Sequence, residues 1–315
     1  MDFSSIKDFL KEDLDKVNKL MATSLSTDIE LLDKTNRAIL SHNGKQVRPV
    51  LTLLVARACS GGFVTDDTIK YAAAVELLHN ATLLHDDVAD DSPVRRGAPT
   101  VMSILGGRAS VLLGDYWLVK GMENILASRN SSDKVIRIFA STLTDLAEGE
   151  LLQLQKTETG DTLEKDYYRI IYDKTASLFV ASAAAGAISV SATEEKMSAA
   201  RTYAKCLGVA FQIRDDIFDY EENAEIGKPV GLDLKEKKIT LPLLGALAKA
   251  GEERGREIRR KLCRIDDHPE YGGEIIEFVK SEGGIECPQA SLRVCGQCED
   301  SVEAFRKHAG GRDAG

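Results

Sequence analysis

The chain has 315 residues, of which 43% are hydrophobic and 29% charged, and its formal net charge is −9. This composition is typical of a globular protein of one or two domains, and its core is large enough to need no disulfide or metal for stability. The acidic balance argues against nucleic acid as a partner. The N-terminal MDFSSIKDFLKEDLDK lacks the basic and apolar regions of a signal peptide, so we expect a cytoplasmic protein.

Helical periodicity dominates the chain. Prolines are few and stand at the borders of the periodic segments, and no stretch alternates as a strand would. Apolar residues recur at three- and four-residue spacing in segments 4–40, 48–59, 66–90, 108–128, 132–158, 163–191, 194–222, 239–250 and 272–281. We therefore predict an all-α protein with one domain over residues 1–315, loops at 60–65, 92–107, 223–238 and 266–271, and a disordered end of about five residues.

The longest apolar stretch is SLFVASAAAGAISVSA at residues 177–192. It is rich in Ala and Ser, and it is too short and too small to span a bilayer. We expect no transmembrane segment here but a buried helix that packs closely against its neighbours.

Residues 83–97, LLHDDVADDSPVRRG, place four acids directly after an apolar helical run. Clustered like charges repel one another and weaken a helix. One explanation is a solvated acidic helix end. The other is a metal site, in which a divalent cation cancels the repulsion between Asp86, Asp87 and Asp90.

A second DDxxD motif in residues 211–220, FQIRDDIFDY, favours the metal site. Residues four apart lie one helical turn apart on nearly the same face, so Asp86 pairs with Asp90, and Asp215 with Asp219. Two such helices are expected to face one another across a cleft. Carboxylates of this kind suit Mg²⁺, which binds through one or two carboxylates plus substrate phosphates.

Basic residues accompany the acidic motifs. Each alone is typical of a surface charge, but together they are expected to clamp two diphosphates, with arginines as forks and lysines as point charges. They are Lys45, Arg48, Arg95, Arg96, Lys174, Lys228 and Lys238.

The motifs GKQVRP, LLHDDVADDSPVRRG, GDYW, EGELLQ, KTASL, FQIRDDIFD and GKPVGLDLKEKKITLP, followed by GGIEC, resemble in order those of the trans-isoprenyl (polyprenyl) diphosphate synthase family. The resemblance implies an all-helical fold around a deep central cavity, in a homodimer. It also implies the head-to-tail (1′-4) condensation of isopentenyl diphosphate with an allylic diphosphate, for which farnesyl diphosphate is the expected primer.

The resemblance assigns roles to the residues that match these motifs. A cluster of about three Mg²⁺ ions on the allylic diphosphate would be held by Asp86, Asp90 and Asp215. The aspartates that would support the ions directly or through water are Asp87, Asp216 and Asp219. The cations of the allylic diphosphate site would be Arg95, Lys174, Lys228 and Lys238. The isopentenyl diphosphate would be bound by Lys45, Arg48, His79 and Arg96. The side chains against the carbocation would be Thr175 and Gln212.

The chemistry implied by the resemblance needs no protein base. Metal and cationic side chains stabilise the departing diphosphate, so that the C–O bond ionises to an allylic cation, and a dry cavity protects it from water. The double bond of isopentenyl diphosphate attacks, and the released diphosphate removes the proton. The finished product passes to the membrane.

Two features depart from the family pattern. The family usually has Gly at the position of Lys237, which puts the roles of Lys237 and Lys238 in question. The tail also carries Cys287, Cys295, Cys298 and His308. This set is compatible with zinc or a redox pair, but the absence of a second CxxC favours a plain helical segment.

Product length is expected to depend on the helix turn before Asp86. That turn carries Ala81 and Thr82, where short-chain family members tend to place aromatic side chains as a floor. The open path, and the likeness of HNATLLHDDVADDSPVRRG to synthases of quinone side chains, favour a long product near octaprenyl. The alternative is geranylgeranyl or farnesyl diphosphate.

Other classes explain less of the sequence. A metal phosphohydrolase of the HD type needs several histidine ligands, and the second DDxxD would have no purpose in it. A terpene cyclase needs no isopentenyl site. A non-catalytic partner subunit typically loses aspartates from these motifs, whereas all six are present here.

Overall fold

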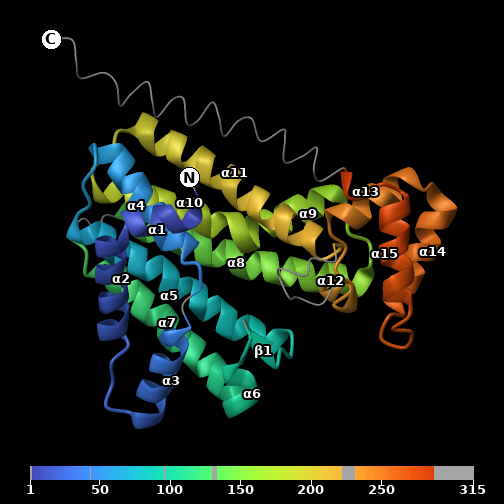
Figure 1. The fold of residues 1–315 in the computed structure, drawn as a ribbon, viewed down its shortest axis with the longest axis horizontal. Helices are drawn as coiled ribbons and strands as arrows, with labels where there is room; N and C mark the ends of the chain where they lie inside the picture. Colours follow the sequence, from blue (N-terminus) through green and yellow to red (C-terminus); the bar gives the residue numbers. More distant parts are fainter. Residues whose placement is uncertain (1, 43, 96, 130–132, 222–230, 287–315) are drawn as a thin grey trace. The chain divides into compact units, whose positions relative to one another are not determined.

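The protein is represented by a computed structural model that describes residues 2–42, 44–95, 97–129, 133–221 and 231–286. Within these residues the regular structure is almost entirely helical, apart from one short antiparallel ribbon (Figure 1). The all-α prediction is therefore confirmed. The expected disorder of the last residues and the Cys-rich tail, with Cys287, Cys295, Cys298 and His308, lie outside the described residues.

The N-terminal half contains α1 (Phe3–Phe9), α2 (Lys11–Ser24), α3 (Glu30–Ser41), α4 (Val47–Ser60), α5 (Asp66–Ala89), β1 (Val94–Arg95), β2 (Ala98–Pro99), α6 (Val101–Leu105) and α7 (Gly107–Leu126). The rest contains α8 (Asp133–Thr159), α9 (Glu164–Ile171), the π-helical turn η1 (Tyr172–Ala176), α10 (Ser177–Ser189), α11 (Glu194–Phe218), α12 (Leu232–Lys235), α13 (Leu241–Lys249), α14 (Glu252–Cys263) and α15 (Tyr271–Ser281).

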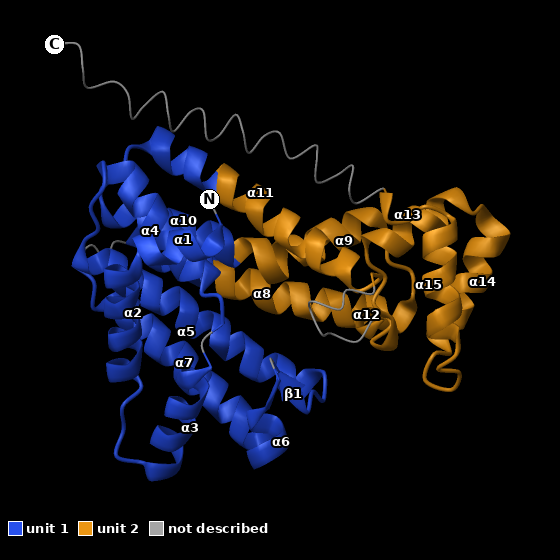
Figure 2. Ribbon diagram, in the orientation of Figure 1, with its two compact units in different colours: residues 1–141, 178–201, 303–315 blue, residues 142–177, 202–302 orange. Residues whose placement is uncertain are grey.

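The chain divides into two compact units (Figure 2). In its described part, unit 1 holds residues up to 141 and residues 178–201, and unit 2 holds residues 142–177 and the residues from 202 onward. The boundaries fall inside α8 and α11 and after the first residue of α10 (Ser177–Ser189), so α8 and α11 contribute substantially to both units. That residues 1–315 act as one domain stays a prediction.

Helix α5 is the central helix of unit 1. It begins at Thr65, whose hydroxyl accepts from the backbone N–H of Thr68, while the Thr68 hydroxyl accepts from the N–H of Thr65. This reciprocal cap fixes the start of the helix. Every residue from Tyr71 to Leu78 is buried, which is typical of a helix surrounded by others. The core around it combines side chains of α2, α4, α5 and α7.

Helix α10 is the close-packed buried helix that the Ala- and Ser-rich stretch predicts. Leu178, Phe179 and most of the alanines that follow are buried. At Gly186, a Cβ atom would lie 2.4 Å from the carbonyl oxygen of Thr52 in α4. Only a residue without a side chain allows this approach of the two backbones.

Unit 2 has its own apolar cores. One joins α13, α14 and α15 with Tyr220 and Leu234. In the other core, Tyr167 and Ile171 of α9 pack against Ile213 and Ile217 of α11. These cores hold the last turn of α11, which carries the second aspartate motif.

Two predicted segments differ from the structure near the N-terminus. Segment 4–40 is three helices and not one, and the predicted loop 92–107 contains the β1–β2 ribbon and α6. Between α2 and α3 the Thr27 hydroxyl accepts from the N–H of Ile29. Such local side-chain hydrogen bonds compete with the helix, and apolar spacing does not register them.

Two further helices fall where none was predicted. Helix α12 lies in the predicted loop 223–238, and α14 lies between predicted segments. Helix α14 buries Gly255, Ile258 and Leu262 alone and is otherwise largely charged. Because few of its positions are apolar, periodicity does not detect it.

No helix in the described part of the chain combines the length and the apolarity needed to cross a bilayer.

Replacing Gly186 with Ala should destabilise the protein by about 1–3 kcal/mol, because the new methyl group would force two backbones apart in the core. The free energy of unfolding in urea measures the effect. Gly273→Ala in α15 is the matched control, because its Cβ would meet nothing within 4 Å and Ala is the better helix former by about 0.5–1 kcal/mol. Equal stability of the two variants would contradict the packing argument.

Candidate active site

The first aspartate motif occupies the last turn of α5. Asp86 and Asp87 are helical, and Asp90 is the C-cap. The N–H of Asp90 still donates to the carbonyl of Asp86 at 2.8 Å, so the two carboxylates stay one turn apart as predicted. A helix C-terminus carries negative partial charge. Three carboxylates there repel both one another and the helix end, unless a cation neutralises them.

Asp87 forms an ion pair with Arg95, which is predicted to bind the allylic diphosphate. Its carboxylate is 4% exposed and accepts from Nε of Arg95 at 2.6 Å. Arg95 belongs to β1, so the short ribbon after α5 presents this arginine beside the motif. Arg96, the next residue, lies outside the described residues.

The GDYW motif supports the same turn of α5 from α7. A Cβ atom at Gly114 would lie 2.3 Å from Nε2 of His85, so the glycine makes room for the imidazole. That ring nitrogen lies 3.2 Å from Oδ1 of Asp115. Asp115 and Gly114 thus hold the residue that precedes Asp86.

The second aspartate motif lies at the end of α11, with Asp215 and Asp216 in the last turn and Asp219 just beyond it. The carboxylate of Asp219 accepts from the backbone N–H groups of Leu232 and Asp233, at 3.0 and 3.1 Å. Asp219 therefore anchors the start of α12, the element that leads to Lys237 and Lys238.

A chain of hydrogen bonds runs from the middle aspartate to two residues predicted to face the carbocation. Tyr167 donates to Oδ2 of Asp216 at 2.6 Å, and Nε2 of Gln212 donates to Oδ1 at 2.8 Å. The hydroxyl of Thr175 donates to Oε1 of Gln212, also at 2.8 Å. The structure thus brings Thr175, Gln212 and Asp216 together, and Asp216 fixes the orientation of the Gln212 amide.

Tyr167 is a site residue that sequence reasoning missed. It is buried, and burial beside Asp216 raises its pKa well above the usual range. Its neighbour Tyr168 is also a tyrosine in a helical pattern. No feature of the sequence distinguishes the two, because only the packing of α9 on α11 selects Tyr167.

The carboxylates at the end of α11 raise one another's pKa. Burial raises the pKa of Asp216 to about 6, and the charges of Asp215 and Asp219 add to the shift. Burial also raises the pKa of Asp219, and it raises that of Asp233 well above its ordinary value beside Asp216 and Asp219. The end of α11 therefore carries a concentration of negative charge that a cation would stabilise.

Lys174 and Thr175 lie on η1, a π-helical turn between α9 and α10. Such turns are rare and occur frequently at functional sites. Nζ of Lys174 lies 2.5 Å from Oε2 of Glu150 in α8. A Cβ atom at Gly149 would lie 2.7 Å from Cβ of Asp173. The EGELLQ motif therefore supplies both the close approach and the ion pair that place Lys174.

The GKQVRP motif forms the start of α4. Gln46 is the N-cap with φ of 55°, and Nε2 of its buried side chain donates to Asn18 at 2.7 Å. Lys45 is exposed just before the helix, and Arg48 lies in its first turn, with its guanidinium 4.9 Å from the centre of the Phe179 ring. A helix N-terminus with two cationic side chains suits a phosphate group.

His79, the remaining described residue predicted to bind isopentenyl diphosphate, is half-buried on α5.

The departure at Lys237 is a conformational one. Lys237 has φ of 57°, a left-handed conformation that glycine adopts without strain. It follows α12 as the C′ residue, and the N–H of Lys238 donates to the carbonyl of Asp233 at 2.8 Å, which completes a helix-ending motif. Lys237 pairs with Asp266, and Lys238 with Glu236. Lys228 lies outside the described residues.

The six aspartates differ in exposure. Asp87 and Asp216 are buried, Asp86 and Asp219 are half-buried, and Asp90 and Asp215 are exposed. Side chains or main-chain groups hydrogen-bond Asp87, Asp216 and Asp219. The part of the chain that the structure describes contains no ready-made group of three or more metal-binding side chains. Carboxylate oxygens in pairs are donors that fit Mg²⁺, which takes one or two carboxylates and completes its shell with phosphate and water.

The predicted chain-length positions precede the motif on α5. Ala81 is fully buried within the core of unit 1, and Thr82 is half-buried, with its hydroxyl donating to the carbonyl of His79 at 2.8 Å.

Comparison with known proteins decides the family. A family model described as polyprenyl synthetase matches residues 29–277. The chain belongs to the polyprenyl synthetase family. It is accordingly a prenyltransferase, and the resemblance carried by its motifs is confirmed.

Relatives of this polyprenyl synthetase differ in what they make. It is 38% identical over 263 residues to octaprenyl diphosphate synthase of Escherichia coli, covering 83% of this chain and 80% of the relative. It is 34% identical over 292 residues to a short chain isoprenyl diphosphate synthase of Methanothermobacter thermautotrophicus, covering 90% and 88%. The structure of a Caulobacter crescentus polyprenyl synthase complexed with calcium and isoprenyl diphosphate matches with a TM-score of 0.85 and 34% identity, covering 96% and 91%.

At position 237 of this polyprenyl synthetase, glycine should give a more stable protein than alanine. We compare Lys237→Gly with Lys237→Ala, because both remove the ion pair with Asp266 and only Ala keeps the strained Cβ. The Gly variant should be more stable by about 1 kcal/mol, the cost of a left-handed residue with a side chain. Urea unfolding measures the difference. Identical stabilities would show that the loop does not hold this conformation.

Metal-free protein should become more stable as the pH falls from 7 to 5. The pKa of Asp216 is about 6 when folded and 3.8 in its ordinary state. Protonation therefore favours the folded state below pH 4, and this contribution is lost as the pH rises through 6. Asp216→Asn should remove about 1 kcal/mol of the rise between pH 7 and pH 5. Unfolding curves at both pH values test this, and superimposable pH dependences of variant and wild type would refute it.

Proposed function

We propose that this prenyltransferase condenses isopentenyl diphosphate head-to-tail (1′-4) onto an allylic diphosphate through an allylic carbocation, and extends farnesyl diphosphate to a product near octaprenyl. The observation that carries the proposal is the pair of aspartate motifs at helix C-termini, each with a cationic element attached to it. Asp87 holds Arg95, and Asp219 anchors the segment that carries Lys238.

Metal dependence is general in this family. We assign Asp86, Asp90 and Asp215 as the ligands of about three Mg²⁺ ions, which when bound supply positive charge to the departing diphosphate. The arrangement of Asp87, Asp216 and Asp219 supports this division, because their hydrogen bonds orient neighbouring groups. These three are assigned to support the ligands.

The allylic diphosphate is assigned to Arg95, Lys174, Lys228 and Lys238. The three of these cations that the structure describes each have a carboxylate neighbour: Asp87, Glu150 and Glu236. Such pairs place a long flexible side chain before the substrate arrives, and this lowers the entropy lost on binding. Arg95 contributes a planar fork, whereas the lysines contribute point charges.

The isopentenyl diphosphate is assigned to Lys45, Arg48, His79 and Arg96. The start of α4 supports this assignment, because backbone N–H groups, the helix dipole and two cations there favour the same anion. The stacking of Arg48 on Phe179 limits its movement, so the guanidinium is prepared for a phosphate.

The carbocation is assigned to Thr175 and Gln212. A hydroxyl that donates its hydrogen to Gln212 presents oxygen lone pairs on its other side. Asp216 fixes the amide, and the amide fixes the hydroxyl. Oriented dipoles of this kind stabilise developing positive charge without reorganisation during the reaction. The released diphosphate accepts the proton, as no protein base is required.

We further infer a homodimer, a cytoplasmic location, and transfer of the product to the membrane for use as a quinone side chain. The surface of α7 supports the dimer. Leu112, Val119 and Leu126 are 60%, 52% and 56% exposed, and their seven-residue spacing puts them on one face of the helix.

Purified protein with Mg²⁺, farnesyl diphosphate and labelled isopentenyl diphosphate should form a ladder of products that ends near eight units. Asp86→Ala and Asp215→Ala should each lower turnover about a hundredfold or more, because charge at the departing diphosphate is lost. Chromatography of the dephosphorylated products measures both length and rate.

The matched control is Asp91→Asn, which removes an exposed carboxylate next to the motif that has no assigned role. Its turnover should equal that of the wild type. No incorporation with any allylic primer would overturn the synthase proposal in favour of a non-catalytic partner subunit. Diphosphate hydrolysis without elongation would indicate a phosphohydrolase. A ladder that stops at three or four units would keep the reaction and refute the long product.

An aromatic side chain one turn before Asp86 should shorten the product. We expect Ala81→Phe to end the ladder several units early while the first condensation continues. Because Ala81 is buried in the core, Thr82→Phe at a half-buried position is the second variant, and circular dichroism checks that both fold. Unchanged product length in a folded, active variant would defeat the assignment of this turn.

A further inference from the structure

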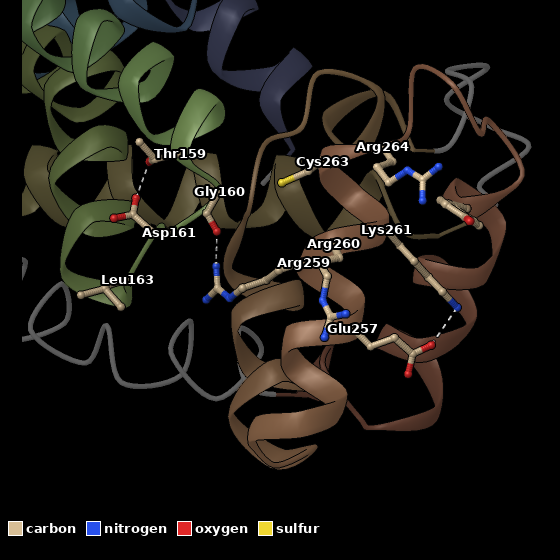
Figure 3. A pocket seen from close by; sticks show the side chains of 11 residues that line it. Thr159, Gly160, Asp161, Leu163, Glu257, Arg259, Arg260, Lys261, Cys263 and Arg264 are labelled. Carbon is tan, nitrogen blue, oxygen red and sulfur yellow. Dashed lines mark hydrogen bonds and ion pairs between the residues drawn. The ribbon is translucent and has the colours of Figure 1, made fainter.

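Unit 2 contains a cavity that the proposed reaction does not use. Its volume is about 730 Å³. One wall is α14 with the residue that follows it, and the other is the segment between α8 and α9, with Tyr271 of α15 completing the lining (Figure 3). None of its lining residues belongs to an aspartate motif or to the assigned substrate sites.

The charge of this lining is unbalanced. Four of its residues are cationic: Arg259, Arg260, Lys261 and Arg264. Its two carboxylates are already paired, since Asp161 lies 3.2 Å from Nζ of Lys156, and Glu257 contacts Arg254 and Lys261. In the described part of the chain no carboxylate forms an ion pair with any of the three arginines.

Arg259 is held by the backbone of the opposite wall. Its guanidinium donates to the carbonyls of Gly160 and Thr162, at 2.7 and 3.3 Å. Burial lowers its pKa and outweighs the opposite effect of the nearby Asp161 carboxylate, so this cation is partly removed from water. These bonds tie α14 to the α8–α9 segment, so the cavity has a fixed wall.

Arg260 and Arg264 are exposed and one helical turn apart. The described partner of Arg264 is a ring nitrogen of His268, 3.0 Å away. Arg260 has no hydrogen bond or ion pair among the residues that the structure describes. Two guanidinium groups at this spacing match two phosphate groups of one ligand, because each forms a planar fork.

Such a concentration of positive charge is not a consequence of composition. The whole chain carries a net charge of −9, yet α14 and the residue after it supply all four cations of the cavity. Helix α14 packs against the rest of unit 2 through the buried Gly255, Ile258 and Leu262. This packing does not explain why its exposed positions carry arginines.

We propose that this cavity binds a small diphosphate-bearing molecule through Arg260 and Arg264, with Arg259 adding positive charge; Lys261 is already paired with Glu257 and Glu274. The site is concave, and its wall includes the apolar side chains of Leu163 and Tyr271, so an organic diphosphate fits better than a flat anionic surface. The proposal does not depend on the reaction proposed above.

Inorganic diphosphate is the probe, titrated into the full chain by calorimetry in metal-free buffer at low salt. Without metal, the aspartate motifs repel the anion. We expect two sites, because the cationic start of α4 also attracts diphosphate without metal, and we expect the double variant Arg260→Gln/Arg264→Gln to weaken one of them about tenfold or more, since two charge-assisted contacts are lost.

Arg256→Gln is the matched control, because Arg256 is an exposed arginine of α14 that does not line the cavity. It should bind as the wild type does, and so should Asp86→Ala/Asp215→Ala. Circular dichroism and the elongation assay confirm that the double arginine variant is folded and active.

The proposal is overturned if the wild type does not bind diphosphate, or if Arg256→Gln weakens binding as much as the double variant, since the attraction would then be a general one. It is also overturned if the double aspartate variant loses binding. A parallel arm measures sedimentation with phosphatidylcholine vesicles that contain phosphatidylglycerol. Arginine-dependent sedimentation without diphosphate binding would replace the small ligand with a lipid surface.

Discussion

Negative charge at two helix ends is the constraint on which the site depends. Both DDxxD motifs fall where a helix already presents the negative end of its dipole, and this costs stability unless cations are near. The second motif shows the cost directly, because burial and neighbouring carboxylates raise the pKa of Asp216 to about 6. Stability of the fold does not require six aspartates at these two helix ends, and the metal ions proposed above would offset the cost.

Three of these aspartates orient neighbouring groups through hydrogen bonds. Each tied carboxylate orients another group: Asp87 holds Arg95, Asp216 holds Gln212, and Asp219 holds the start of α12. Glycines at 114 and 149 allow neighbouring segments to approach closely enough for this. Catalysis through charge stabilisation requires groups that hydrogen bonds hold in place, since the dipoles are then set before the reaction begins.

Helix α14 presents the opposite electrostatic problem in the same unit. Arg259 of this helix and Arg264 just after it meet backbone carbonyls and a histidine instead of carboxylates. Unit 2 thus contains two regions of opposite charge. The carboxylates at the end of α11 would be stabilised by cations, and the arginines of the α14 cavity by an anion. In both cases a charged group without a balancing partner marks a position where a ligand is expected.

Much of the site was readable from the sequence, because it depends on local spacing. Asp86 and Asp90 are one turn apart by helix geometry alone, and the buried Ala-rich helix α10 follows from its composition. The short α12 and the breaks within segment 4–40 were missed because they depend on side-chain hydrogen bonds that apolar periodicity does not record. The charged α14 was missed because few of its positions are apolar. The sequence by itself determined the helical class, the family and the identity of the aspartates. Only the tertiary structure decided that Tyr167 and not Tyr168 holds Asp216, that Lys237 is left-handed, and that α14 forms a basic cavity wall, because each results from contacts between residues distant in the chain or from a backbone conformation that no residue type dictates.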